Sequence, residues 1–169
     1  PPDINVSRGG FTVDGESIRF GLNAVKSVGR NLIDAVVKDR KNRPYRGLYD
    51  FCKRLHGNEL NRRALENLVK AGAFDALEPT RRGMIDSAEG VLKSVETDAR
   101  QNLEGQMDLF GMMGGEEEQA ATDYKIPNTP EYLASELLKM EKEVSGLYLS
   151  GHPLDAYRPQ IRQISTCTI

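Results

Sequence analysis

The spacing of apolar residues predicts a mainly helical chain that begins with one small β-hairpin. The segments 11–13 and 18–20 alternate apolar and polar residues and flank Asp14-Gly15, a dipeptide that tolerates the positive φ angles of a tight turn. Apolar residues then recur at helical spacing in three groups, which predicts three short helices. The groups are Leu32, Ile33, Val36 and Val37; Leu48, Phe51, Cys52 and Leu55; and Leu65, Leu68 and Val69.

Two more amphipathic helices are expected further along the chain. One covers roughly residues 81–104, with Ile85, Ala88, Leu92, Val95 and Leu103 on one side. For the other, Thr129 can cap the helix and Pro130 fits its first turn. Its apolar stripe must dock on another part of the chain, and we expect the first helical unit to receive it. The stripe consists of Leu133, Leu137, Met140, Val144 and Leu147, and ends at Gly151.

Residues 105–128 interrupt this pattern. They hold four glycines and the acidic run Glu116-Glu117-Glu118, without a sustained apolar period, which is typical of a mobile linker. The sequence therefore predicts an all-α fold with a small β-hairpin and three parts. These are a helical domain with the hairpin over 1–104, a linker over 105–128, and a C-terminal helical part over 129–169.

Charge is distributed unevenly, although the net charge is only -2. Residues 1–82 hold 16 Lys and Arg against 10 Asp and Glu, whereas residues 83–169 hold 7 against 15. A basic front half can approach a polyanion such as nucleic acid, although a solvated surface of mixed charge would give the same count. The two cysteines indicate no disulfide framework, and no apolar run is long enough to span a bilayer, so we expect a cytoplasmic protein without a membrane partner. The start on Pro1-Pro2 without Met suggests a piece of a longer polypeptide.

The segment 21–36 has the pattern of a helix-hairpin-helix, because an apolar residue precedes Gly29 at the start of a predicted helix. Gly29 lets the backbone come close to a ligand, and the free N–H groups of residues 29–31 lie at the positive end of the helix dipole. A DNA phosphate fits such a site without base readout. Ser27 stands where the motif usually has its first glycine, and a packing turn between core helices is the alternative interpretation. The candidate DNA-binding residues are Lys26, Ser27, Val28, Gly29, Arg30 and Asn31.

A second unit of the same kind is expected between the helix around Leu65 and the helix that begins near residue 81. Two tandem hairpins can contact both strands of a duplex. Gly72 is equally consistent with an ordinary helix C-cap. The candidate DNA-binding residues of this unit are Lys70, Ala71, Gly72, Ala73, Arg81 and Arg82.

A short apolar peptide lies inside the predicted linker, between Gly105 and Gly111. A Gln, two spacers and a Leu-Phe pair match the peptide by which many bacterial replication proteins dock on the sliding clamp. The alternative is that the peptide folds back onto the helices of this chain. Its residues are Gln106, Met107, Asp108, Leu109 and Phe110.

The sequence offers no catalytic centre. His56 and His152 are isolated, no phosphate-binding loop occurs, and the expected strands carry no paired carboxylates for Mg²⁺. We therefore expect no cofactor in this chain. A glycosylase-like enzyme is the alternative, since that class needs an Asp shortly after the hairpin, and Asp34 and Asp39 stand at suitable positions.

Several long blocks of the sequence resemble one family, the bacterial replicative DNA polymerase III alpha subunits, which are C-family polymerases. The resemblance runs in order along nearly the whole chain, with only 112–128 unmatched. The blocks are Pro1-Pro2-Asp3-Ile4-Asn5, residues 18–26, Leu48-Tyr49-Asp50-Phe51-Cys52, residues 60–65, residues 70–75 and residues 147–154.

The resemblance implies an internal fragment of a DNA-directed DNA polymerase, a nucleotidyltransferase whose Mg²⁺-binding carboxylates lie outside this chain. By position, residues 26–31 and 70–73 would bind primer–template duplex, 106–110 would bind the sliding clamp (the beta subunit), and the last helix would lead to a missing OB-fold. Other holoenzyme subunits are implied as partners. The rival interpretation is a structural domain that packs between the fingers and OB regions without contacting DNA.

Overall fold

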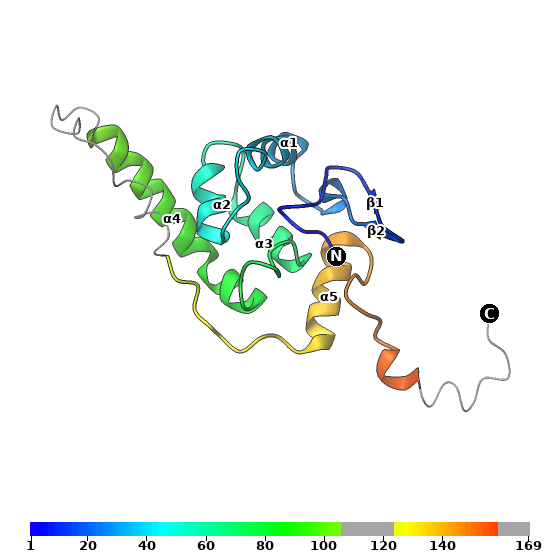
Figure 1. The fold of residues 1–169 in the computed structure, drawn as a ribbon. Coiled ribbons are helices and arrows are strands. Elements are labelled where there is room, and N and C mark those ends of the chain that lie inside the picture. The colour runs from blue at the N-terminus through cyan, green and yellow to red at the C-terminus, as the bar shows by residue number, and fades with distance from the viewer. Residues whose placement is uncertain (106–123, 159–169) are drawn as a thin grey trace.

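The computed structural model describes residues 1–105 and 124–158, and within them the chain is mainly helical (Figure 1). A two-stranded hairpin, β1 (Thr12–Asp14) and β2 (Ser17–Arg19), precedes a short 3-10 turn, η1 (Leu22–Ala24). Five α-helices follow in the described ranges: α1 (Arg30–Asp39), α2 (Leu48–Arg54), α3 (Arg62–Lys70), α4 (Arg81–Gly105) and α5 (Ala134–Ser145). A last 3-10 turn, η3, covers Asp155–Tyr157. The expected fold class is confirmed.

The β-hairpin lies one residue from its expected position. The strands are antiparallel, with Val13 opposite Ile18, and Gly15 adopts a φ of 62° in the turn. A two-stranded ribbon is marginal alone, and both Val13 and Ile18 are exposed here. Phe11 instead packs edge-on against Phe20, with the ring centroids 4.9 Å apart, which ties the ribbon to the helical body.

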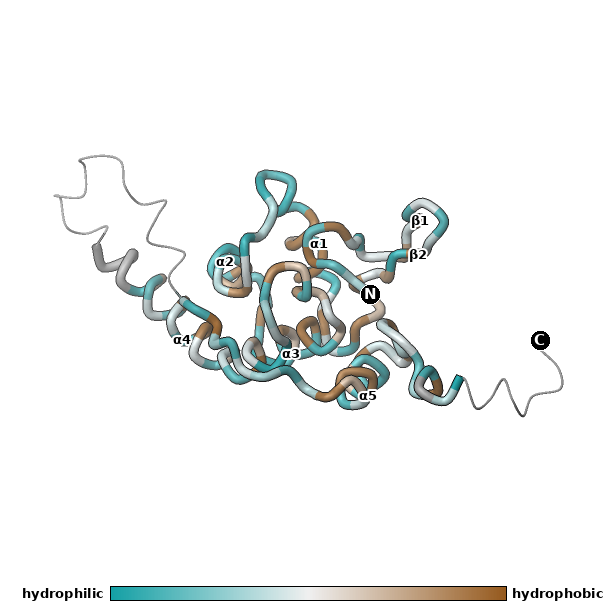
Figure 2. Tube along the Cα trace, turned by 60° about the horizontal axis from the view of Figure 1, so that its bottom comes forward, coloured by the Kyte–Doolittle hydropathy of each residue, from teal (hydrophilic) through white to brown (hydrophobic). Residues whose placement is uncertain are grey.

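The main core lies between α1, α2, α3 and the first half of α4. The predicted apolar stripes of α1, α2 and α3 are buried or half-buried, including Leu32 and Ile33 of α1. In α4 the buried apolar residues are Met84, Ala88, Val91 and Val95, whereas the expected Ile85 and Leu92 are only half-buried. Phe51 is at the centre and meets Tyr45 and Phe74 edge-to-face, with centroid distances of 5.1 and 5.0 Å. Figure 2 shows hydrophobic residues gathered in the central part of the fold, around α3. Burial raises the pKa of the Cys52 thiol to about 12, as expected for a packing residue.

The expected start of the last helix was wrong. The helix begins at Ala134 rather than near Pro130, because Glu131 caps a different helix. Its carboxylate accepts hydrogen bonds from the backbone N–H groups of Arg81 and Arg82, at 2.7 and 3.2 Å, and thereby satisfies the first turn of α4. Residues 129–132 consequently stay extended.

The end of α5 also differs from the expectation. The helix stops at Ser145, and Gly146 follows with a φ of 81°. Leu147 is consequently exposed and lies outside the apolar stripe. Val144, by contrast, is buried beside Val25 and Phe20, so the end of α5 meets the first helical unit as expected. The rest of α5 packs against α3, and Leu133 is exposed.

Residues 124–128, assigned to the linker by composition, lie extended along α4. The Tyr124 ring stacks on Tyr49 with its centroid 6.0 Å away. Two glycines of α4 make this approach possible: a Cβ on Gly90 would lie 2.3 Å from the Tyr124 hydroxyl, and one on Gly83 would lie 2.3 Å from the Pro127 carbonyl oxygen. This end of the predicted linker is therefore packed against the helix.

Candidate nucleic-acid interface

The first predicted hairpin forms a surface turn, but its first arm is shorter than expected. The single 3-10 turn η1 replaces a first α-helix, and buried Leu22 and Val25 hold it in place. The chain then crosses to α1, for which Gly29 is the N-cap residue. The second arm, α1, is a full helix of 10 residues, so a helix N-terminus does lie at the turn.

Ser27 adopts the conformation that glycine would supply. Its φ is 61°, in the left-handed region that costs an ordinary residue about 1–2 kcal/mol. The turn therefore keeps the backbone path associated with the glycine and carries local strain instead. Having Ser27 in place of the usual glycine therefore affects the stability of this hairpin and leaves its backbone shape unchanged.

The surface of this turn is open to solvent. Lys26, Ser27 and residues 29–31 are exposed, whereas Val28 is half-buried against the small core around Val25. No acceptor in the described part of the chain bonds the backbone N–H groups of residues 29–31. These N–H groups and the positive end of the α1 dipole can bind an anion.

Two polar contacts modify the charge of the turn. The Lys26 ammonium donates to the Glu143 carbonyl oxygen at 2.7 Å, so it serves the C-terminal end of α5 as well as the turn. The Glu59 carboxylate accepts a hydrogen bond from the Asn31 side-chain amide at 3.1 Å. Its other oxygen would lie 3.5 Å from a Cβ on Gly29. Glu59 therefore places a negative charge beside the proposed phosphate site, which no pattern in the sequence indicated.

The second predicted hairpin is a helix C-cap inside the fold. Gly72 has a φ of 83°; its N–H donates to Val69 O, and the N–H of Ala73 donates to Leu68 O, which together form a Schellman motif. Ala71, Gly72 and Ala73 are all buried. Their assignment to DNA contact is corrected on this ground, because a phosphate cannot reach them in this structure.

Arg81 is likewise an interior residue rather than a surface cation. Its side chain is 5% exposed and forms a two-pronged ion pair with Asp75, at 2.9 and 2.6 Å. A further hydrogen bond, 3.0 Å long, joins it to Glu141 of α5, which is fully buried. The prediction that Arg81 binds phosphate is therefore corrected: its guanidinium joins α4 to α5. Arg82 is exposed, whereas Lys70 is half-buried and lies 3.7 Å from the Glu143 carboxylate.

Glu141 completes this buried network. Its second carboxylate oxygen accepts from the backbone N–H groups of Leu149 and Ser150, at 2.8 and 2.9 Å. Burial alone would raise the pKa of Glu141, but these N–H donors and the positive charge of Arg81 hold that pKa below its usual value. The carboxylate is thus kept ionised, where it fixes the chain that leaves α5.

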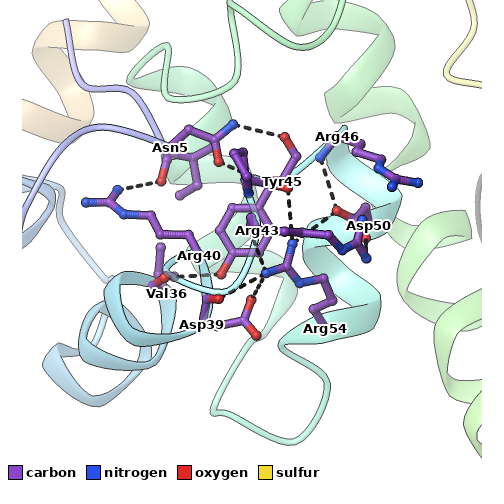
Figure 3. A network of polar contacts seen from close by, with 11 residues as sticks. Asn5, Val36, Asp39, Arg40, Arg43, Tyr45, Arg46, Asp50 and Arg54 are labelled. Carbon is purple, nitrogen blue, oxygen red and sulfur yellow. Dashed lines mark hydrogen bonds and ion pairs between the residues drawn. The ribbon is translucent and has the colours of Figure 1, made fainter.

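A basic loop between α1 and α2, residues 40–46, was not singled out from the sequence. Tyr45 anchors it, since its backbone N–H and carbonyl both bond the Asn5 side chain, as Figure 3 shows. Asp50 accepts from the backbone N–H of Arg46 and from the Arg43 and Arg54 side chains. The loop holds four Lys and Arg among seven residues, a density that could have drawn attention to it.

The two Asp residues considered for a glycosylase do not form a site with each other. Asp34 is exposed on α1, and Asp39 pairs with Arg54 at 2.6 Å, so neither is arranged as the base of a glycosylase. Within residues 1–105 and 124–158, no group of three or more His, Cys, Asp or Glu could hold a metal ion. No helix of the described residues combines the length and apolarity that a membrane span requires. The clamp peptide, residues 106–110, lies outside the described residues.

The fold and the exposed turn define a helix-hairpin-helix domain, and comparison with known proteins agrees. Residues 1–84 match the family model described as a helix-hairpin-helix motif. The chain is also similar to DNA polymerase III alpha subunits along its whole length. It is 39% identical to that of Deinococcus radiodurans over 170 residues, which cover 100% of this chain and 12% of that subunit. The Escherichia coli subunit is 39% identical over 167 residues, covering 96% and 14% respectively.

A third relative, the alpha subunit of Xylella fastidiosa, is 36% identical over 170 residues, which cover 99% of this chain and 14% of that subunit. Over the stretch that it covers, the chain belongs to the family of bacterial DNA polymerase III alpha subunits. The chain spans between 12% and 15% of the length of the relatives it matches. It corresponds to a small part of such a subunit.

Proposed function

We propose that this chain holds primer–template duplex for a bacterial replicative polymerase and tethers that polymerase to the sliding clamp. The proposed duplex binding rests on the exposed turn 26–31, which has backbone N–H groups without hydrogen-bond partners at the start of α1. Phosphate contacts of this kind position a duplex without reading its sequence. The clamp tether rests on the sequence of residues 106–110, and the cytoplasmic, holoenzyme setting rests on the relatives.

DNA contact is restricted to a smaller surface than the tandem motif implied. The turn 26–31 would bind phosphate through Arg30, the backbone N–H groups and the part of Lys26 not engaged by Glu143. From the second unit, Arg82 and the accessible part of Lys70 would add contacts to the DNA backbone. These observations support one phosphate-binding turn, residues 26–31, with cations on either side of it.

Salt titration of duplex binding tests this proposal. We expect an affinity that is independent of base sequence and that falls steeply with salt, with a log–log slope of about -2 to -3 for two or three phosphates. Arg30→Ala should weaken binding to all sequences and reduce the slope by about 1. Lys93→Ala, an exposed cation of α4, is the matched control and should leave both quantities unchanged. Absence of binding at low salt would overturn the DNA-gripping function.

Clamp binding needs a separate experiment. A pull-down with the sliding clamp should retain the native chain and lose the double variant Leu109→Ala/Phe110→Ala, because the two side chains would fill an apolar pocket. Met112→Ala/Met113→Ala removes two neighbouring apolar side chains and serves as the control. Equal retention of both variants would remove the clamp assignment.

The second candidate function, a packing domain that does not contact DNA, has its own supporting observation. Residues 71–73 and Arg81 are used to join α3, α4 and α5, as a structural module requires. The two functions differ in the Arg30→Ala experiment. If the chain is only a packing domain, the native chain should show no salt-dependent duplex binding, and Arg30→Ala should have no effect.

A further inference from the structure

A cavity of about 300 Å³ lies beside the start of α2. Its walls come from the start of α2, the α3–α4 loop and the extended segment that runs along α4. Of its aromatic and ionisable lining residues, Asp50 is already bonded to Arg43, Arg46 and Arg54. The others are Arg46, Tyr49, Glu78, Tyr124 and Lys125, on which binding would depend. The functional assignment above uses none of them.

One wall is aromatic and held in a fixed orientation. The rings of Tyr49 and Tyr124 are nearly parallel, with 9° between their planes. The Tyr49 hydroxyl donates to the Asp98 carboxylate, and the tip of Tyr124 fits against Gly90, so both rings are positioned by α4. Tyr49 is buried, whereas Tyr124 is only half-buried and offers the more accessible ring. A flat ring presented in this way is a platform on which a nucleobase can stack.

Glu78 supplies a hydrogen-bond acceptor at the cavity. Its Oε1 accepts from the Leu48 backbone N–H at 2.8 Å, while Oε2 has no hydrogen-bond partner within the described residues. No Lys or Arg of those residues forms an ion pair with it either. Burial raises the pKa of this carboxyl group. A carboxylate oxygen left without a donor suits an exocyclic amino group of a base.

Two cations border the same cavity. The Arg46 backbone is held by Asp50 at 3.1 Å, and in Figure 3 its side chain points away from that network. Neither Arg46 nor Lys125 forms an ion pair within residues 1–105 and 124–158, and both are exposed. Cations free of carboxylate partners next to a stacking platform are the arrangement by which proteins bind single strands.

We propose that this cavity binds one unpaired nucleotide of single-stranded DNA. The base stacks on Tyr124, its amino group donates to Glu78 Oε2, and Arg46 and Lys125 bind the adjoining phosphates. This proposal rests on the proposed function only in assuming that the chain binds DNA. The two sites bind different forms, because the cavity binds a single strand and the turn 26–31 binds a duplex. Bases that carry an amino group should be preferred over thymine.

The first experiment measures base preference with the 169-residue chain and fluorescent 12-nucleotide oligomers. We expect oligo(dC) to bind about five-fold more tightly than oligo(dT), because cytosine offers an amino donor to Glu78. Glu78→Gln can still accept from Leu48 through its carbonyl oxygen but presents an NH₂ donor to the cavity. This variant should therefore bind oligo(dT) at least as tightly as oligo(dC). Equal binding of the two oligomers by the native chain, or an unchanged preference in Glu78→Gln, would overturn the role of Glu78.

The second experiment tests stacking. Tyr124→Leu should weaken oligo(dC) binding about ten-fold, whereas Tyr124→Phe, which keeps the ring, should bind like the native chain. Equal affinities of the two variants would overturn the stacking site. Arg30→Ala separates this proposal from the duplex-binding function: it should weaken duplex binding and leave the preference for oligo(dC) intact. Loss of that preference in Arg30→Ala would mean that the single strand binds at the turn 26–31 instead of the cavity.

Discussion

Replacing Glu141 by Gln tests whether the buried network between α4 and α5 stabilises the fold. The substitution preserves size but removes the charge and turns one acceptor oxygen into an NH₂ donor. In the structure, one oxygen of Glu141 faces the Arg81 guanidinium at 3.0 Å, and the other faces two backbone N–H groups. A Gln amide therefore places donor against donor on one side, whichever way it is turned.

The expected loss follows from the burial of this residue. Glu141 is fully buried, and Arg81 is 4% exposed, so water cannot replace the lost acceptor. Removing one partner of a buried ion pair costs about 3–5 kcal/mol, and a hydrogen bond to a charged group is worth about 1.5–3 kcal/mol. Arg81 keeps its ion pair with Asp75, which places the expected value at the lower end. We expect Glu141→Gln to lower the free energy of unfolding by about 3 kcal/mol.

Chemical denaturation followed by circular dichroism measures this difference, and a thermal scan should show a shift of roughly 6–12 °C. Glu143→Gln is the matched control two residues away. Its carboxylate side chain is 67% exposed and lies 3.7 Å from the Lys70 ammonium, so its loss should cost under about 1 kcal/mol. Equal destabilisation by Glu141→Gln and Glu143→Gln would refute the reasoning.

The same network sets a pH dependence. Because the pKa of Glu141 is lower in the fold than in the unfolded chain, the folded state favours the ionised form. The stabilisation is therefore present above the unfolded value of about 4.3 and is lost as the pH falls through the folded pKa. The difference in stability between the native chain and Glu141→Gln should accordingly shrink below about pH 4.

Substitutions at three further places test local features, two of them with a comparison variant. Ser27→Gly relieves the left-handed conformation and should raise stability by about 0.5–1 kcal/mol in denaturation, whereas Ser27→Ala should not. Gly83→Ala should destabilise by about 1–3 kcal/mol because its Cβ meets a backbone oxygen at 2.3 Å. Gly90→Ala meets the Tyr124 hydroxyl at the same distance, and because that ring can swing away from α4, the substitution should cost less in the same assay. Glu59→Gln removes a negative charge beside the turn 26–31 and should raise duplex affinity by about two- to five-fold at low salt. An unchanged affinity would remove Glu59 from the phosphate site.

The sequence by itself determined the elements and their order. Periodicity located α1 to α4, and Asp14-Gly15 located the hairpin, because the positive φ of Gly15 and the burial of one helix face depend on local sequence alone. The helix start at Gly29 could be predicted for the same reason. Long blocks of sequence were enough to identify the family.

Only the tertiary structure decided which charged groups reach solvent. Arg81 resembles a surface cation in the sequence and is buried, because Asp75 and Glu141, 6 and 60 residues away, converge on it. Glu131 caps α4 across 50 residues and thereby delays the start of α5. The cavity near Tyr124 likewise combines segments distant in the sequence. Pairings of this kind depend on how the helices pack, and a linear pattern carries no record of that packing.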